Sequence, residues 1–545
     1  MAEPPRARTT AAQRQLAGGE HARGRGHGAE PAAVLSARAA ARRATRRRLL
    51  NAYLRETGTP VRGTGSLRIA LPATCGELVV EVVHRCTLGH HDYADDTSVP
   101  HEEFVAALLA ELAAGTGHDG FELAAQIEES TARTARYLAR ARPRRPAEAH
   151  AITRHAEQSV LLGHPFHPTP KSAEGFSDAD LERYAPELGA TFVPHYFAVA
   201  RELVSQQRVW PGPWEPGEVA ARVPRGYLPL PAHPWQARYL LDRAEVTALI
   251  REGGLVPLGP LGRPVYATSS ARTVCDPGFP TAWKLPLRVR ITNFVRNNPM
   301  EHLRRAMEAS GLIGTLPTHE GFGVLLESGF RTLNPDAVGP DLAADFAVLY
   351  RENPFAHNGE APRVLAGVLE DPGVLVRDVR AAGDVGEWLR RYLAISLVPL
   401  LSLFEQHGVS LEAHVQNSLL CTDGGQPSRL WVRDLEGVAV SSQAGRPLAP
   451  GSPLGYSDAE AWQRLCYHAV TNQLGHLVHV LGRYSGAGEE RLWAVARRVL
   501  LDVPQAGRLL AMPTLPAKAN LVSRFTGRAE RPLYVEIPNP LRETR

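Results

Sequence analysis

Frequent proline and glycine divide this 545-residue chain into short segments that have the patterns of strands and of helices. Residues 191–199, 264–268 and 285–292 are rich in residues that favour strands, whereas residues 102–114 and 121–141 show helical hydrophobic spacing. The two kinds of segment do not alternate regularly, and no internal repeat is visible. The pattern therefore predicts an α+β fold rather than a regular βαβ fold or a solenoid.

The chain divides by composition into a tail and three larger parts. Residues 1–45 are rich in Arg, Ala and Gly and lack hydrophobic periodicity, so we expect a disordered, solvated tail with a helix starting near Ala39. The predicted parts are residues 1–45, 46–150, 151–385 and 386–545. The run ARPRRP closes the second part.

Charge, hydropathy and cysteine usage exclude several classes of protein. The net charge of +4 comes from the tail, because residues 1–48 carry eleven Arg and three Glu, while the rest carries 50 basic and 54 acidic residues. A mildly acidic body argues against nucleic-acid binding. No apolar run is long enough to span a membrane, and the first residues lack a signal-peptide core, so we expect a cytoplasmic protein. The five cysteines form no CxxC pair, which argues against a zinc knuckle or a disulfide framework.

Lysine is rare, since only three of the 61 basic residues are Lys. These residues are Lys171, Lys284 and Lys518, and all three fall in the motif-like stretches described below. Each is either a chance survivor of a strong bias toward Arg or a position that needs a compact ammonium group.

Two stretches contain histidine beside proline. GHPFHPTPKSAEGF (163–176) must form a loop because its prolines prevent a helix, and such loops present cations and amides to phosphate. Its His164 and His167 would need a third ligand to bind a metal, and a rigid surface turn is the simpler alternative. In HPWQ (233–236) we expect a structural role, with Pro234 fixing a turn and Trp235 filling the core.

A third region alternates hydroxyl groups and cations. Strand periodicity would place Ser270 and Arg272 on one face of ATSSARTV, and would likewise align Arg290, Thr292 and Phe294. Hydroxyl and guanidinium groups without nearby carboxylates suit a phosphate or a polycarboxylate, although an ordinary exposed strand face is the alternative.

A fourth region places a carboxylate, an imidazole and an amide in one row. In a strand, Glu412, His414 and Gln416 of LEAHVQN would share a face, with Asn417 adjacent. Together with Asp434 of VRDLEG, they would suit a nucleotide and Mg²⁺, because hard cations prefer oxygen ligands. The chain has no GxxxxGK[ST] loop, no GxGxxG after a strand and no GxSxG elbow.

Taken in order, these stretches resemble the NRPS-independent siderophore synthetases, the aerobactin-synthetase (IucA/IucC) family. The stretches that match are GHPFHPTPKSAEGF, HPWQ, TSSARTV, KLPLRVRITNFVR, HGVSLEAHVQN, VRDLEGV and KANLVSRF, which extend from about residue 46 to the end. The resemblance implies thumb, fingers and palm lobes (residues 46–150, 151–385 and 386–545) around a deep central cleft, and often a homodimer. It also implies that ATP and Mg²⁺ adenylate citrate or a related acid, which then condenses with a polyamine, an amino acid or an amino alcohol.

The resemblance also assigns roles to individual residues. ATP phosphates would be bound by His167, Ser270, Arg272, Thr273 and Lys284. The acid would be bound by Thr292, Arg296 and His414, and the catalytic residues would be Lys284, Arg296 and His414. ATP and Mg²⁺ would be oriented by Glu412, Gln416, Asn417 and Asp434, with Glu412 and Asp434 as metal ligands. Ala173 departs from the family pattern, in which an Arg or a similar residue often follows two positions after the motif lysine.

ITNFVRNN resembles the subgroup that acts on free citrate. One alternative function is a ferric-siderophore reductase or iron-binding protein related through the C-terminal part. Such proteins need a terminal cysteine cluster, and this chain has no cysteine after Cys466. The other alternative is an inactive scaffold of the same fold.

Overall fold

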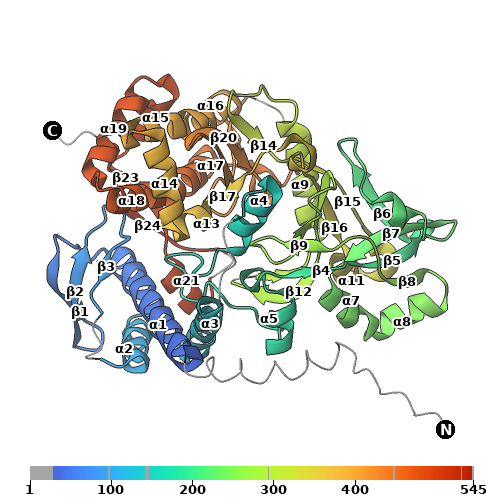
Figure 1. The fold of residues 1–545 in the computed structure, drawn as a ribbon, viewed down its shortest axis with the longest axis horizontal. Coiled ribbons are helices and arrows are strands. Elements are labelled where there is room, and N and C mark those ends of the chain that lie inside the picture. The colour runs from blue at the N-terminus through green and yellow to red at the C-terminus, as the bar shows by residue number, and fades with distance from the viewer. Residues whose placement is uncertain are drawn as a thin grey trace, which may run out of the picture.

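The computed structural model describes residues 29–95, 99–140, 146–292, 294–445, 448–528 and 531–542. Figure 1 shows three groups of elements, which are N-terminal (blue), central (green) and C-terminal (yellow to red). Helices and strands are mixed throughout, which confirms the predicted combination of both. Among the described residues, no helix is both long and apolar enough to cross a bilayer.

The N-terminal group is a small sheet beside three helices. The sheet has the order β1 (Gly65–Leu71), β2 (Gly76–His84), β3 (Asp92–Tyr93), and the helices are α1 (Ala29–Glu56), α2 (His101–Thr116) and α3 (Phe121–Ala139). Helix α1 begins ten residues before the predicted start near Ala39, so residues 29–45 of the predicted tail are helical. The burial of Ala41 and Thr45 explains this difference, because α1 packs there against its neighbours. The prediction for residues 1–28 lies outside the described residues.

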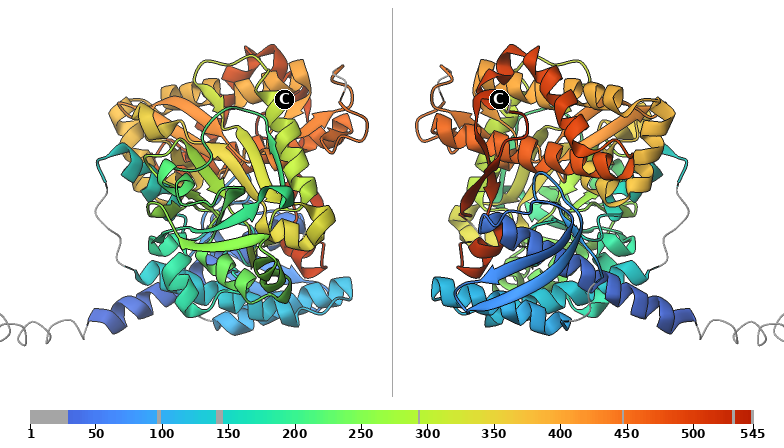
Figure 2. Two further views of the ribbon diagram at one scale, coloured as in Figure 1. Left: turned by 90° about the vertical axis from the view of Figure 1, so that its right-hand side faces the viewer. Right: turned by 90° about the vertical axis from the view of Figure 1, so that its left-hand side faces the viewer.

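The C-terminal end of the chain returns to this group. Helix α21 (Asn520–Phe525) inserts Leu521 and Phe525 into the same core as Tyr53. The Glu56 carboxylate at the end of α1 accepts the backbone N–H groups of Leu521 and Val522 at 2.9 and 2.8 Å. Figure 2 shows the blue elements beneath the red ones, so the two ends of the sequence support each other.

The central group is built on an antiparallel seven-stranded sheet. Its order is β4 (Thr191–Phe192), β9 (Val265–Ala267), β10 (Thr273–Cys275), β11 (Thr281–Lys284), β16 (Val348–Glu352), β15 (Glu327–Leu333), β6 (Val204–Arg208). A second sheet has the order β7 (Tyr227–Ala232), β5 (His195–Ala200), β8 (Leu255–Pro260), and β12 (Leu287–Ile291) forms a hairpin with β13 (Phe294–Arg296). Trp283, Tyr350 and Phe197 fill the core between the two sheets.

Short helices surround these sheets. They are α4 (Ala149–Gln158), α5 (Asp178–Tyr184), α6 (Gly217–Ala220), α7 (Pro234–Leu241), α8 (Ala244–Arg251), α9 (Met300–Ile313), α10 (Pro335–Val338), α11 (Pro340–Phe346) and α12 (Phe355–Asn358). HPWQ starts α7, so Pro234 lies in the first turn of a helix and not in the predicted turn. His233 and Gln236 are the fully buried residues of HPWQ, whereas Trp235, which was predicted to fill the core, is half-buried. The Gln236 side chain bonds the backbone of Arg288 and Asp345, which explains its burial.

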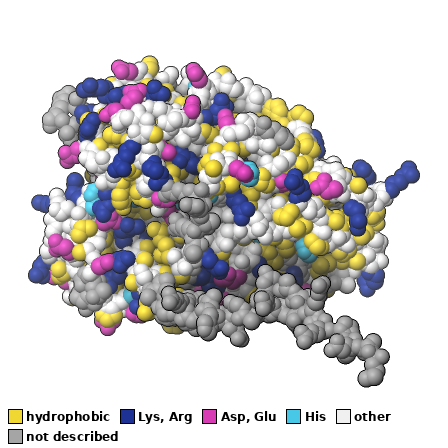
Figure 3. All heavy atoms as spheres, viewed as in Figure 1, with side chains coloured by type: hydrophobic (Ala, Val, Ile, Leu, Met, Phe, Trp, Pro, Cys, Tyr) yellow, Lys and Arg dark blue, Asp and Glu magenta, His cyan; other side chains and the backbone are white. Residues whose placement is uncertain are grey.

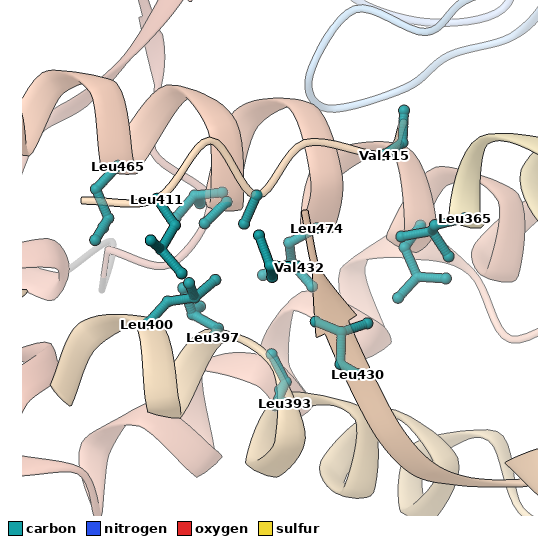
Figure 4. Packing of buried hydrophobic residues seen from close by; sticks show 14 of the residues in the cluster. Leu365, Leu393, Leu397, Leu400, Leu411, Val415, Leu430, Val432, Leu465 and Leu474 are labelled. Atoms are coloured by element: carbon teal, nitrogen blue, oxygen red, sulfur yellow. The ribbon is translucent and has the colours of Figure 1, made fainter. Parts of the chain in front are cut away.

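The C-terminal group combines two small sheets with long helices. The first sheet has the order β14 (Phe322–Val324), β20 (Gln426–Val432), β19 (Ser418–Asp423), β17 (Arg363–Val364). The second sheet has the order β18 (Val409–Ser410), β21 (Ala439–Ser441), β22 (Gly455–Tyr456). The helices are α13 (Leu365–Glu370), α14 (Pro372–Ala382), α15 (Val385–Ile395), α16 (Leu397–His407), α17 (Asp458–Leu465), α18 (Gly475–Tyr484), α19 (Glu489–Leu501) and α20 (Gly507–Ala511). A hairpin of β23 (Thr514–Lys518) and β24 (Tyr534–Pro538) follows. Figure 4 shows the leucine-rich core around Leu393, Leu400 and Leu430.

One predicted strand is mostly a loop. The chain ends α16 at Gly408, as predicted, but residues 411–417 bend and turn before β19 begins at Ser418. The N–H of His414 bonds the carbonyl of Glu412, and that of Asn417 bonds the carbonyl of His414, so these groups are used in local turns instead of a strand ladder. The prediction that Glu412, His414 and Gln416 share a strand face is therefore wrong.

Candidate active site

A buried ion-pair cluster lies where the central sheet meets the turn after β20. Lys284, the last residue of β11, is 4% exposed, and its amine donates to Asp434 at 2.7 Å and to Glu436. Asp434 adopts a left-handed backbone conformation with φ of 69°, which directs the chain into the short helix Leu435–Gly437. One lysine thus holds both carboxylates of this turn.

Two arginines complete the cluster. Arg351 lies on β16, the strand next to β11, and contacts Asp434 and also Glu327 at 3.0 Å. Arg272 lies 3.6 Å from Glu436 and donates to the Arg296 carbonyl at 3.1 Å and to the Asn298 side chain. The following residues form the cluster, which we call the cationic cluster: Arg272, Lys284, Arg351, Glu327, Asp434 and Glu436.

The two turn carboxylates are ionised at neutral pH. Burial alone would raise the pKa of Asp434, but Arg351 and Lys284 hold that pKa well below its usual value. The pKa of Glu436 is also lowered, because Lys284 and Arg272 outweigh the burial. An ionised pair of carboxylates is suited to binding a divalent cation. It also allows Lys284 to leave the carboxylates and pair with an incoming phosphate.

Thr292 lies in the turn that joins β12 to β13, and Arg296 is the last residue of β13. Arg296 donates to the Ile291 carbonyl and to the Thr292 hydroxyl, both at 2.9 Å, and its Nε is buried with no hydrogen-bond partner among the described residues. Burial and Arg272 lower the pKa of Arg296 to about 10, so the guanidinium stays charged. Thr292 has φ of 58° and forms a turn, so the predicted alignment of Arg290, Thr292 and Phe294 on one strand face is wrong.

The serine segment also forms a turn rather than a strand. Ala271 has φ of 64°, and the Ser270 hydroxyl accepts the N–H of Thr273 at 3.1 Å. The predicted strand face shared by Ser270 and Arg272 is therefore wrong, because this left-handed residue lies between them. The turn nevertheless lets Arg272 reach the cationic cluster, while Thr273 begins β10 opposite Lys284.

Gln416 connects this turn to the 411–417 loop. Its side chain donates to the Ser269 carbonyl at 3.3 Å, while Arg433 donates to the Gln416 carbonyl at 2.9 Å. Arg433 also pairs with buried Glu157, whose carboxylate accepts the Ser269 N–H at 3.0 Å. Gln416 thus bonds Ser269, the residue before the predicted Ser270, although Ser269 and Gln416 are 147 positions apart.

His414 lies beside a second buried polar group. Its ring centroid is 5.7 Å from that of His468, and burial lowers the pKa of both imidazoles, so they are neutral near pH 7. Glu412 pairs with Arg464 at 2.6 Å and lies 3.8 Å from His468. Asn417 donates to the Glu412 carbonyl at 3.2 Å and so holds the loop.

His414 is influenced by charged residues of both groups. Burial is the largest cause of its lowered pKa, and Glu412, Lys518, Asp434 and Arg433 also act on that pKa. Glu412 and Asp434 themselves pair with different cations, whereas Asp434 shares Lys284 with Glu436.

The first histidine motif reaches this region through His164. Its Nε2 lies 3.2 Å from the side-chain nitrogen of Asn472, whose side-chain oxygen accepts the Val415 N–H at 3.2 Å. His167 is buried and accepts the N–H of Thr169 at 3.1 Å. Burial, with His167 nearby, lowers the pKa of His164 well below its usual value. The motif therefore lies against the 411–417 loop.

The other two lysines have different surroundings. Lys171 is buried against Glu187 at 2.6 Å and the Val160 carbonyl, which is a structural ion pair. Lys518 lies over the Tyr467 ring at 4.8 Å, near Glu412. Of the three lysines, Lys284 and Lys518 therefore belong to the candidate site.

Several polar residues of the site were not predicted from the sequence. They are Glu157, Asn298, Glu327, Arg351, Glu436, Arg464, His468 and Asn472. Glu436 lies within the VRDLEG stretch, two positions after Asp434, and its motif could have identified it. Arg351 had a weaker signal, a lone cation in the apolar strand VLYRE, because only pairing of β16 with β11 places it near Lys284.

Comparison with known proteins agrees with this arrangement. A sequence model of the IucA / IucC family matches residues 153–370, and one of the ferric iron reductase FhuF-like transporters matches residues 386–533. The L-2,3-diaminopropanoate–citrate ligase of Staphylococcus aureus is 33% identical, covering 91% of this chain and 95% of that protein. The spermidine-citrate ligase of Bacillus anthracis is 30% identical over 71% of this chain and 73% of that protein.

Solved structures show the same fold. The ATP-bound aerobactin synthetase IucA of Klebsiella pneumoniae superposes with a TM-score of 0.80 at 22% identity, over 92% of this chain and all of that chain. Fold and site together define a protein of mixed helices and sheets with a buried cluster of cations and carboxylates. The chain belongs to the IucA/IucC family of siderophore synthetases.

Proposed function

We propose that this chain is an ATP-dependent ligase that adenylates citrate or a closely related acid and joins it to an amine. The observation that carries the proposal is the convergence of Arg272, Lys284 and Arg351 on the carboxylates of Asp434 and Glu436. Relatives that act on citrate and an amine supply the substrate class.

Phosphate binding would use the cations of this cluster. Arg272 and Lys284 would hold ATP phosphates, supported by the Ser270 hydroxyl, by Thr273 and by His167. Guanidinium and ammonium groups are the usual protein ligands of phosphate, and the carboxylates that now neutralise them would yield to a more highly charged anion.

Mg²⁺ fits the acidic side of the same cluster. Mg²⁺ is commonly held by one or two carboxylates together with substrate phosphates. Asp434 is the main candidate ligand. Glu436, which shares Lys284 with Asp434, is the second candidate. Glu412, which was predicted as a ligand from the sequence, lies on the adjoining loop. Bound there, the ion would neutralise phosphate charge and so favour the departure of pyrophosphate.

Acid recognition would use Arg296, Thr292 and His414. The Arg296 guanidinium has an unused buried donor at Nε, and a carboxylate is its natural partner. Neutral His414 can accept a proton from the incoming ammonium group, which frees the amine lone pair for attack, or donate a hydrogen bond to the acid. Gln416 and Asn417 would keep the His414 loop in place for both substrates.

The reaction then has two balanced steps. An oxygen of the acid attacks the α-phosphorus of ATP, and pyrophosphate leaves. The amine next attacks the acyl carbon, AMP leaves, and the proton lost by nitrogen passes to a base. Cations around the reacting groups reduce the repulsion between the two anions, and fixed positions remove translational freedom before reaction.

Several finer points belong to the same proposal. The nucleophile would be a polyamine or an amino acid, with an amino alcohol giving an ester instead of an amide. We also propose a cytoplasmic homodimer with thumb, fingers and palm lobes around a deep cleft. Neither the ferric reductase nor the inactive scaffold is supported by a specific contact in the site.

The test is pyrophosphate release measured with citrate, 2-oxoglutarate and succinate, each with and without a diamine or 2,3-diaminopropanoate. Release that depends on citrate and is trapped by hydroxylamine supports the proposal. Arg296→Ala should reduce this release by at least about 100-fold, the usual effect of losing a charged transition-state contact. Arg288→Ala is the matched control, because Arg288 is 41% exposed on the same hairpin and pairs with Asp345 instead. Lack of release with every acid would refute the activity.

A further inference from the structure

A second polar cluster lies at the contact between the N-terminal sheet and the C-terminal helices. His84 ends β2, His479 lies on α18, and Glu489 begins α19. One nitrogen or oxygen atom from each lies within 4.8 Å of the others. No other group of three or more His, Cys, Asp or Glu in the described residues meets this criterion.

The distances suit one bound ion. Nδ1 of His479 and Nε2 of His84 lie 3.2 and 3.5 Å from the same carboxylate oxygen of Glu489. Ligands held about 2.0–2.2 Å from a tetrahedral zinc ion are roughly 3.3–3.5 Å apart. An ion could therefore be placed among the three atoms with little movement of the side chains.

The carboxylate is held in position by its backbone surroundings. The second oxygen of Glu489 accepts the Thr87 N–H at 2.9 Å, which is the type of contact that orients a metal-binding carboxylate. Gly482 allows α18 and α19 to approach, because a Cβ there would lie 2.9 Å from the Glu489 backbone and side chain. Burial alone would raise the pKa of Glu489, but hydrogen bonds from His479 and Thr87 lower it to about 2.

His84 supplies an independent indication. Its Nε2 is buried, faces the Glu489 carboxylate and has no hydrogen-bond partner among the described residues. A buried polar atom without a partner is costly unless something binds it.

Nearby positive charge is already neutralised. Arg483 acts on the pKa of His84, and both Arg483 and Arg47 pair with Asp92, at 2.8 and 2.7 Å. His90 stacks on His479 with a centroid distance of 5.2 Å and stays neutral, because burial lowers its pKa well below the usual value. A divalent ion at Glu489 would thus meet neutral imidazoles and a paired arginine.

We propose that His84, His479 and Glu489 bind one divalent first-row transition-metal ion that joins the N-terminal sheet to the C-terminal helices. Two imidazoles and one carboxylate favour zinc or ferrous iron over magnesium, which prefers oxygen ligands alone. This site uses none of the residues of the cationic cluster, so it stands independently of the proposed catalytic function.

The experiment uses the untagged full-length chain after removal of metal with a chelator. Equilibrium dialysis against Zn²⁺, Fe²⁺ without oxygen, and Mg²⁺, followed by elemental analysis, gives the stoichiometry. We expect one Zn²⁺ or one Fe²⁺ per chain, no retained Mg²⁺, and a higher melting temperature of the metal-bound protein. Co²⁺ should give the visible absorption bands of a bound ion with nitrogen ligands.

Conservative variants separate the site from other histidines. Glu489→Gln keeps an acceptor for Thr87, and His84→Gln changes a residue near the surface, so both should fold. Each should weaken metal binding by at least about 10-fold. His150→Gln, an exposed histidine beside Glu148, is the control and should bind as wild type. Absence of binding to the wild-type chain, or wild-type affinity in both site variants, would overturn the proposal.

Discussion

At the scale of single residues, Lys284 explains why a lysine persists in a chain that otherwise uses Arg. Its ammonium group lies between Asp434 and Glu436, while Arg272 and Arg351 approach the same carboxylates from outside. A compact ammonium can contact two converging carboxylates in a space too small for a planar guanidinium. The interpretation of this lysine as a geometric requirement is therefore favoured over chance.

Lys284→Arg tests that interpretation, since it keeps the charge and changes only the shape. We expect pyrophosphate release to fall at least about 10-fold, because a misplaced cation loses part of its transition-state contact. Arg288→Lys is the reciprocal control on a neighbouring strand and should retain wild-type rates. Wild-type turnover by Lys284→Arg would show that any cation suffices at this position.

At the scale of elements, a π-helix carries much of the second polar group. Residues Cys466–Leu474 form this segment between α17 and α18, and Asn472 lies within it. Its amide oxygen accepts the Val415 N–H and its amide nitrogen contacts His164. π-Helical turns occur often at functional sites because they redirect side chains from the regular helical positions.

Asn472→Leu should separate the histidine motif from the 411–417 loop. Leaving a buried N–H without a partner costs about 1–3 kcal/mol. We therefore expect kcat/KM for the acid to fall roughly 10–100-fold, with a lower melting temperature. Gln463→Leu, which replaces a half-buried amide on α17, is the comparison variant. An unchanged kcat/KM in Asn472→Leu would mean that the 411–417 loop keeps its conformation without the Asn472 side chain.

Element geometry also marks the limit of what the sequence predicted. Helical spacing located α2 and α3 correctly. Ser270, Thr292 and His414 were assigned to strands, yet each lies in or beside a turn, because left-handed residues such as Ala271 and Thr292 cannot be recognised from alternation. The convergence of Lys284 and Arg351 on Asp434 depends on the pairing of strands far apart in the sequence, which local patterns do not encode.

At the scale of the whole molecule, many histidines are buried in a neutral form. Eleven of them have a lowered pKa, with burial as the largest cause. For His233 and His476 the pKa falls to about 3.

On the face seen in Figure 3, acidic and basic side chains are intermixed, so the surface does not concentrate one sign of charge there.

This burial predicts loss of stability in mild acid. Below pH 6.5, the unfolded chain takes up protons that the folded histidines do not, and each histidine that stays neutral then removes about 1.4 kcal/mol per pH unit. Glu56 acts in the opposite direction, because burial raises its pKa to about 7, and burial also raises the pKa of Glu327, Asp345, Glu352 and Glu370. These five carboxylates are fewer than the eleven histidines. We expect the melting temperature to fall steadily from pH 7 to pH 5. A constant or rising melting temperature over that range would contradict the buried, neutral assignment.

The central claim is that the cationic cluster transfers AMP to a carboxylate, and an oxygen-18 experiment tests it most directly. Citrate labelled in its carboxylates is incubated with ATP and an amine, and the products are examined by mass spectrometry. Attack of the acid on the α-phosphorus predicts AMP that carries one labelled oxygen, with unlabelled pyrophosphate. Label in inorganic phosphate together with ADP, or amide formation with unlabelled AMP, would contradict the account.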